Sequence, residues 1–145
     1  MTVPKVDFYL LSDTEPRARL RTACRLAEKA YEQGLRVALR TGSAAETAEL
    51  DDLLWTFNDR SFVPHCVWPT DLGLAADTPV LIGSGALPES HRDVLVNLGD
   101  DAPTGFEDYV RVLEIVGAGE TAKTLARSRW RRYREHGANP ESHNL

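Results

Sequence analysis

The chain has 145 residues, a length that corresponds to one domain. Its 42% hydrophobic and 27% charged residues are close to the globular average and exclude disordered and fibrous classes. The net charge of −5 argues against a protein that binds nucleic acid over its whole surface. No apolar run is long enough for a membrane span or a signal peptide, and two cysteines, Cys24 and Cys66, are too few for a disulfide framework. We therefore expect a single cytoplasmic domain.

The first part of the chain alternates strand and helix patterns. Residues 6–11 are aromatic-rich and predict a buried strand. Residues 13–16 combine cap-like side chains with a proline, which predicts that a helix starts there, and its apolar stripe ends at Gly34. Residues 35–40 alternate in polarity and predict a second strand. The order strand, helix, strand is that of a βαβ unit.

A second helix is predicted from Ser43, because Ser43 and Glu46 have the spacing of a capping box. The remaining elements are a loop over 69–79, strands over 80–83, 94–98 and 109–116, and a helix over 120–135. We expect 109–116 to be the last strand, residues 1–137 to form one domain and residues 138–145 to be a flexible tail. The pattern predicts a single Rossmann-like α/β domain with a mixed, mostly parallel sheet flanked by helices.

Catalytic and cofactor motifs are weak in this chain. The turn after the first strand, Ser12-Asp13, lacks the glycines of a dinucleotide-binding loop. Gly42-Ser43 offers backbone amides at a helix start, but a plain cap explains them as well. No pattern of metal-ligand spacing occurs. We therefore expect no catalytic residues, no metal and no cofactor.

The predicted last helix carries an unusual charge. Residues 120–135 contain six of the 17 basic residues and two of the 22 acidic ones, so this segment has a charge of +4 and the rest of the chain −9. Lys123, Arg127 and Arg131 recur every four residues and therefore share a stripe, with Trp130 beside it. A solvated basic face, a nucleic-acid site and a site for an acidic peptide all fit this pattern. Among the functional interpretations we favour the acidic peptide, because the remaining surface repels phosphates.

A second feature is an aromatic side chain outside the predicted core stripe. Trp55 follows Leu54 and points about 100° away from it around the helix. It precedes the apolar segment 62–64. This arrangement is typical of a protein-binding patch. It is equally consistent with a Trp55 side chain that the loop after Trp68 covers.

Three segments taken together resemble the chi subunit of bacterial DNA polymerase III holoenzyme. The resemblance extends over almost the whole chain, in the same order. Its most specific part is the signature in residues 50–65, and the helix signature in 125–134 supports it. The segments are Phe8-Tyr9-Leu10-Leu11, Leu50-Asp51-Asp52-Leu53-Leu54-Trp55-Thr56-Phe57 with Ser61-Phe62-Val63-Pro64-His65, and Leu125-Ala126-Arg127-Ser128-Arg129-Trp130-Arg131-Arg132-Tyr133-Arg134.

The resemblance implies a Rossmann-like domain that binds no nucleotide and is not itself an enzyme. It implies an accessory protein of the clamp loader that pairs with the psi subunit and holds the acidic C-terminal tail of single-stranded DNA-binding protein (SSB). Contact with the clamp loader and with DNA would then be indirect, with no membrane involved. The rival hypotheses are a small nucleotide-binding enzyme that uses Gly42-Ser43 and a direct nucleic-acid binder that uses the last helix.

The resemblance also assigns two groups of site residues. The SSB-tail site maps onto Val116, Lys123, Arg127, Trp130 and Arg131, where Trp130 and Arg131 stand in place of the family's common Tyr and Lys. The psi site maps onto Trp55, Phe62, Val63 and Pro64.

Overall fold

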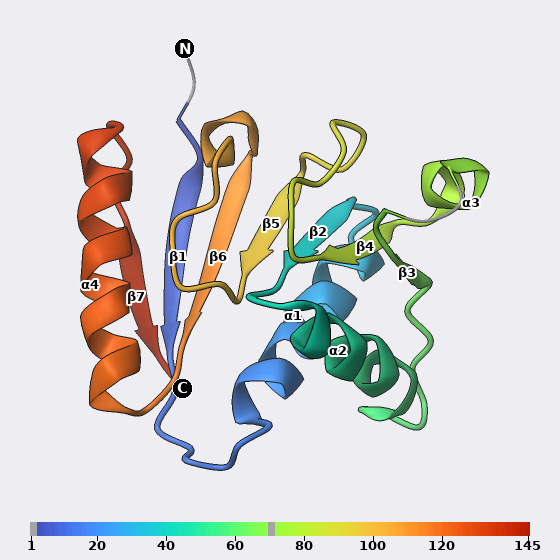
Figure 1. The fold of residues 1–145 in the computed structure, drawn as a ribbon, viewed down its shortest axis with the longest axis horizontal. Helices are drawn as coiled ribbons and strands as arrows, with labels where there is room; N and C mark the ends of the chain where they lie inside the picture. Colours follow the sequence, from blue (N-terminus) through green and yellow to red (C-terminus); the bar gives the residue numbers. More distant parts are fainter. Residues whose placement is uncertain (1–2, 70–71) are drawn as a thin grey trace.

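The structure is a computed structural model that describes residues 3–69 and 72–145. It contains one open sheet of seven strands in the order β3-β4-β2-β5-β6-β1-β7, and every pairing is parallel (Figure 1). The predicted α/β class is confirmed, although the sheet is wholly parallel rather than mixed. The strands are β1 (Lys5–Leu10), β2 (Val37–Arg40), β3 (His65–Val67), β4 (Val80–Gly83), β5 (Val94–Asn97), β6 (Arg111–Val116) and β7 (Glu141–Asn144).

The helices divide between the two faces of the sheet. Helices α1 (Ala18–Glu32) and α2 (Ala44–Thr56) pack on one face, through a core that includes Cys24 and Leu54. Helix α4 (Glu120–Glu135) packs on the other face and runs alongside β1 and β7 (Figure 1). None of the helices within residues 3–69 and 72–145 is both long and apolar enough to span a membrane.

Two boundaries differ from the sequence predictions. Helix α1 begins at Ala18, after an N-cap residue, Arg17, that makes no side-chain capping bond. The Asp13 carboxylate instead accepts a hydrogen bond from the Glu15 amide at 2.8 Å, which closes a turn ahead of the helix. The loop predicted over 69–79 is wrong in part, because α3 occupies Leu72–Asp77 and buries Ala75 against the sheet; residues 70 and 71 lie outside the described residues.

The end of the chain also differs from its prediction. The strand over 109–116 is not the last, because Glu141–Asn144 forms β7 at the edge of the sheet beside β1. Leu145 donates its amide to Leu10 O at 3.0 Å, and the Ser12 hydroxyl donates to Leu145 O at 2.9 Å. These contacts involve the backbone of the last residues, so they leave no hydrophobic pattern in the sequence. They place within the sheet a segment that the sequence predicts to be a tail.

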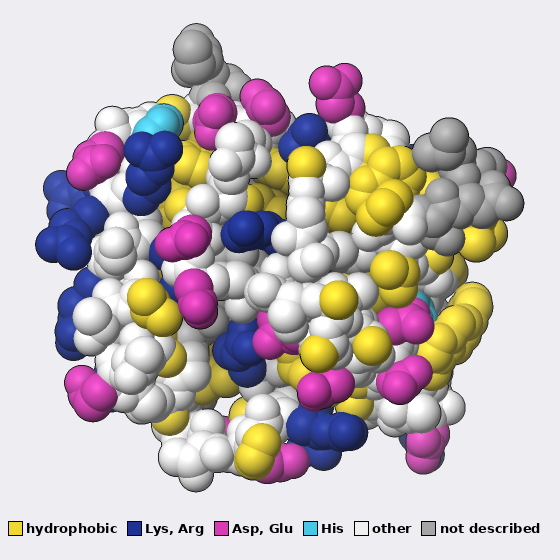
Figure 2. Space-filling model, viewed as in Figure 1, with side chains coloured by type: hydrophobic (Ala, Val, Ile, Leu, Met, Phe, Trp, Pro, Cys, Tyr) yellow, Lys and Arg dark blue, Asp and Glu magenta, His cyan; other side chains and the backbone are white. Residues whose placement is uncertain are grey.

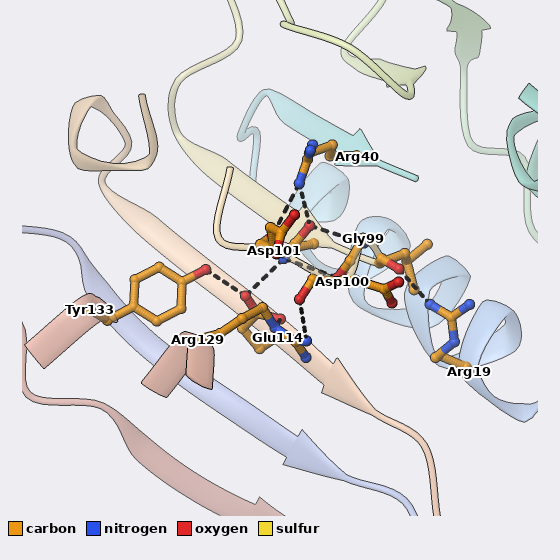
Figure 3. Close-up of polar contacts among 10 residues, drawn as sticks. Arg19, Arg40, Gly99, Asp100, Asp101, Glu114, Arg129 and Tyr133 are labelled. Atoms are coloured by element: carbon orange, nitrogen blue, oxygen red, sulfur yellow. Dashed lines mark hydrogen bonds and ion pairs between the residues drawn. The ribbon is translucent and has the colours of Figure 1, made fainter. Parts of the chain in front are cut away.

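A buried carboxylate joins α4 to the sheet. Glu114 on β6 is fully buried and faces α4 (Figure 3). Its Oε1 accepts a hydrogen bond from Arg129 Nε at 2.9 Å, and its Oε2 accepts from Asn97 Nδ2 at 2.9 Å and from the Tyr133 hydroxyl. Burial raises the pKa of Glu114, and the Arg129 guanidinium opposes that rise. Arg129, which is not among the three residues of the predicted basic stripe, is therefore a buried structural residue.

Replacing Arg129 by Ala is expected to destabilise the fold by about 3–5 kcal/mol, because it leaves the Glu114 charge buried without its partner. Urea denaturation monitored by circular dichroism measures this change. Arg132→Ala, on the exposed side of the same helix, should change the free energy of unfolding by less than about 0.5 kcal/mol. A loss below about 1 kcal/mol for Arg129→Ala would contradict the assigned role.

A second prediction concerns the pairing of β1 with β7. Asp7 Oδ1 lies 2.9 Å from His143 Nε2, and Asp7 Oδ2 accepts from Arg111 at 3.1 Å. Burial raises the pKa of Asp7, but the hydrogen bonds from His143 and Arg111 outweigh it and hold the pKa below its ordinary value. A carboxyl group whose folded-state pKa is lowered stabilises the fold above its unfolded-state pKa, and this contribution disappears as the pH falls through the folded-state pKa.

The stability difference between the parent chain and Asp7→Asn should therefore shrink as the pH is lowered from about 6 to about 3. Denaturant midpoints measured across that range test it, with Asp59→Asn in an exposed turn as the control. A difference that is independent of pH would be the contrary result.

Candidate functional site

A groove lies beside α4, over the carboxyl ends of β1 and β6. Its volume is about 250 Å³. Phe8, Leu10 and Val116 supply apolar surface from the sheet, since residues two apart on a strand share a face. The residues that α4 contributes to the groove are Lys123, Ala126, Arg127 and Trp130.

The aromatic wall of the groove is held in place by the core. The half-buried Trp130 ring packs against Phe8, with ring centroids 5.0 Å apart and planes tilted by 49°. Phe8 in turn contacts Tyr133, the residue whose hydroxyl binds Glu114. The wall is therefore preorganised.

The groove is also positively charged. Lys123 Nζ lies 3.7 Å from the exposed Glu120 carboxylate, a weak pair. Within residues 3–69 and 72–145, no carboxylate lies within 4.0 Å of the Arg127 guanidinium, so its planar set of donors is available to a ligand. Figure 2 shows basic side chains gathered along the margin of the molecule where α4 lies.

The structure brings four of the five predicted tail-site residues into this one groove. The fifth, Arg131, is exposed on α4 and does not line it. Phe8, Leu10 and Ser142 line the groove but were not predicted. Their strands are joined by long-range parallel pairing, for which the local sequence gives no signal.

The second predicted surface lies at the end of α2. Trp55 is 54% exposed and Phe62 is 63% exposed, and their ring centroids are 5.7 Å apart. The Trp55 ring also packs against His65, with ring centroids 4.5 Å apart. Pro64 is half-buried, whereas the Val63 side chain is buried in the core. Val63 must therefore be removed from the set of side chains that a partner is expected to contact.

The start of α2 is already occupied by the chain's own carboxylate. Ser43 Oγ accepts from the Glu46 amide at 3.1 Å, which confirms the predicted cap. The Glu46 carboxylate accepts from the Gly42 amide at 2.9 Å and pairs with Arg19 at 2.5 Å. An acidic group therefore stands where a phosphate would bind.

One cluster of potential metal ligands was not anticipated from the sequence. Asp7, Glu141 and His143 place ligand atoms within 4.8 Å of one another. Both oxygens of Asp7 already have partners, and one of these partners is the cationic Arg111. The contacts are those of an ion-pair cluster that ties β7 to β1.

Comparison with known proteins identifies the family. The model of the family described as DNA polymerase III chi subunit, HolC, matches residues 3–141. The chain is 41% identical to the DNA polymerase III subunit chi of Pseudomonas aeruginosa over 141 residues, which is 97% of this chain and 96% of that protein. It is 28% identical to the Haemophilus influenzae subunit chi over 95% of each chain, and 29% identical to the Escherichia coli subunit chi over 91% of this chain and 92% of that one. The chain therefore belongs to the DNA polymerase III chi subunit family.

Proposed function

We propose that this replication accessory subunit is a non-catalytic adaptor that links the psi subunit to the acidic C-terminal tail of SSB. It would work in the cytoplasm, within the replisome, and would reach the clamp loader through psi and DNA through SSB. The observation that carries the proposal is the α4 groove. It combines a fixed apolar wall with the Arg127 guanidinium, which no carboxylate of the described residues pairs with.

The chemistry of the groove suits an acidic chain end. A tail that ends in acidic residues, an apolar side chain and a free carboxylate needs fixed cations and an apolar contact. Arg127 offers a planar fork to a carboxylate, with Lys123 one turn away on the rim. Trp130 and Val116 form the surface on which the apolar side chain would pack.

The Trp55–Phe62 pair is the proposed contact for psi. Two large aromatic rings more than half exposed and packed on each other form the kind of anchor that protein interfaces use. The pair lies at the end of α2, so it shares no element with the α4 groove.

The rival functions have less support. Nucleotide binding at Gly42-Ser43 would require displacement of the Glu46 carboxylate from the Gly42 amide and of the Ser43 hydroxyl from the Glu46 amide. Direct nucleic-acid binding through α4 is opposed by the −9 charge of the other residues. Titration with single-stranded oligonucleotides at physiological salt, without SSB, distinguishes direct nucleic-acid binding from the adaptor function. The adaptor should bind the oligonucleotides only weakly.

Replacing Arg127 by Ala should weaken binding of an SSB tail peptide by roughly 2 kcal/mol, the cost of losing a charged hydrogen-bond partner. Calorimetric titration measures it. Arg132→Ala removes the same charge from the exposed side of α4 and should cost well under about 1 kcal/mol. A peptide with an amidated C-terminus should lose most of the affinity. Equal losses at Arg127 and Arg132 would show diffuse attraction instead of a shaped site.

Replacing Trp55 by Ala should lower the affinity for psi by about 2 kcal/mol or more, the scale of a central interface aromatic. Because Trp55 is more than half exposed, the free energy of unfolding should change by less than about 1 kcal/mol. Leu74→Ala, at an equally exposed apolar residue on α3, is the matched control. Unchanged capture of psi by the Trp55 variant, or a large loss of stability, would refute the assignment.

A further inference from the structure

A second cavity lies on the face of the sheet that α4 only partly covers. Its volume is about 280 Å³, close to the lower end of small-ligand sites. Leu95 on β5 forms part of its floor, and Leu87 and Pro103, from the loops before β5 and before β6, form apolar walls. No residue of this cavity lines the α4 groove.

Two arginines line the cavity, and no acidic residue does. They are Arg40, at the end of β2, and Arg92, just before β5. Over the described parts of the chain, no carboxylate lies within 4.0 Å of either guanidinium. By contrast, the cavities beside Asp13 and beside Asp100 each contain an acidic side chain. In a chain of net charge −5, two arginines that line one cavity without an acidic residue in its lining require an explanation.

Both guanidinium groups are held in place. Arg40 donates through one amino nitrogen to Asn97 Oδ1 at 3.4 Å and to Asp101 O at 3.1 Å, so it lies against the loop after β5 (Figure 3). Arg92 stacks over the Tyr109 ring, with its guanidinium carbon 4.8 Å from the ring centroid. These contacts fix each group while leaving most of its N–H donors for a ligand.

We propose that this cavity binds a small phosphate monoester, with the phosphate between Arg40 and Arg92 and the organic part on Leu87 and Pro103. One dianionic phosphate balances both guanidinium charges, whereas one carboxylate balances only one, and planar arginine forks match phosphate oxygens. Asp100, Asp101, Glu107 and Asp108 are exposed on the neighbouring loop, and their charges disfavour a long polyanion. The proposal does not depend on the adaptor function.

The test is an NMR titration of the full chain with ribose 5-phosphate as the probe. We expect saturable shifts confined to the signals of residue 40 and of residues 84–95 and 103–109, which include all the residues that line the cavity. Arg40→Gln and Arg92→Gln should each weaken binding about tenfold or more, as expected for a lost charged hydrogen bond. Arg60→Gln, which removes an exposed arginine from the turn after α2, should leave the affinity unchanged.

Two further arms make the result decisive. Inorganic phosphate should bind at the same residues but more weakly than ribose 5-phosphate, because it makes no apolar contact. Arg92→Lys keeps the positive charge but lacks the planar set of donors, so its affinity for ribose 5-phosphate should still fall severalfold. This variant keeps the test valid if a glutamine variant folds poorly. The proposal is overturned by uniform shifts over all basic surfaces, by unchanged affinity in both arginine variants, or by an acidic peptide that displaces ribose 5-phosphate from this cavity.

Discussion

The Glu114 carboxylate is buried where water does not reach it, so protein donors must satisfy it, and this requirement sets the position of α4. Arg129 and Tyr133 approach it from the helix and Asn97 from β5. Ala126, Arg129 and Tyr133 are the buried stripe of α4. The stripe offset by one residue, Lys123, Arg127 and Trp130, then necessarily faces the rim over β1 and β7. The α4 groove thus lies on the exposed side of a helix whose rotation about its axis is fixed by a buried ion pair.

The register of the strands places the residues around Glu114 in one row that crosses the sheet. Arg40, Asn97, Glu114, Phe8 and Ser142 occupy one row, on β2, β5, β6, β1 and β7. The row is polar from Arg40 to Glu114, where hydrogen bonds connect neighbouring strands. It becomes apolar at Phe8, which supports Trp130. The Arg40 cavity and the α4 groove therefore lie at the two ends of one row of side chains, separated by the buried carboxylate.

The sequence predicts those features that depend on the spacing of residues within one segment. The limits of α4 and the Ser43 cap follow from spacing within one segment, and the structure agrees with them. Of the predicted basic stripe, Lys123 and Arg127 line the groove and Arg131 does not. Phe8 and Ser142 were missed because they reach the groove through pairing between strands more than 100 residues apart. Strand β7 has no apolar alternation that would predict it, and its backbone pairing and the Asp7–His143 contact hold it against β1. The burial of Val63 was missed because the segment after α2 has no period from which to infer a face.

The strand order determines how two partners would bind without interfering with each other. Helix α2 leads into β3 at one edge of the sheet, and α4 leads into β7 at the opposite edge. Six strand spacings separate these edges in the seven-stranded sheet, or roughly 29 Å at about 4.8 Å per spacing. Screening at physiological salt acts over about 8 Å, so charges at the α4 groove have little effect on the Trp55–Phe62 pair. Any coupling between the two surfaces would therefore have to pass through the packed sheet. The strand order thus separates the two proposed binding surfaces by most of the width of the sheet, and this separation favours independent binding of the two proposed partners.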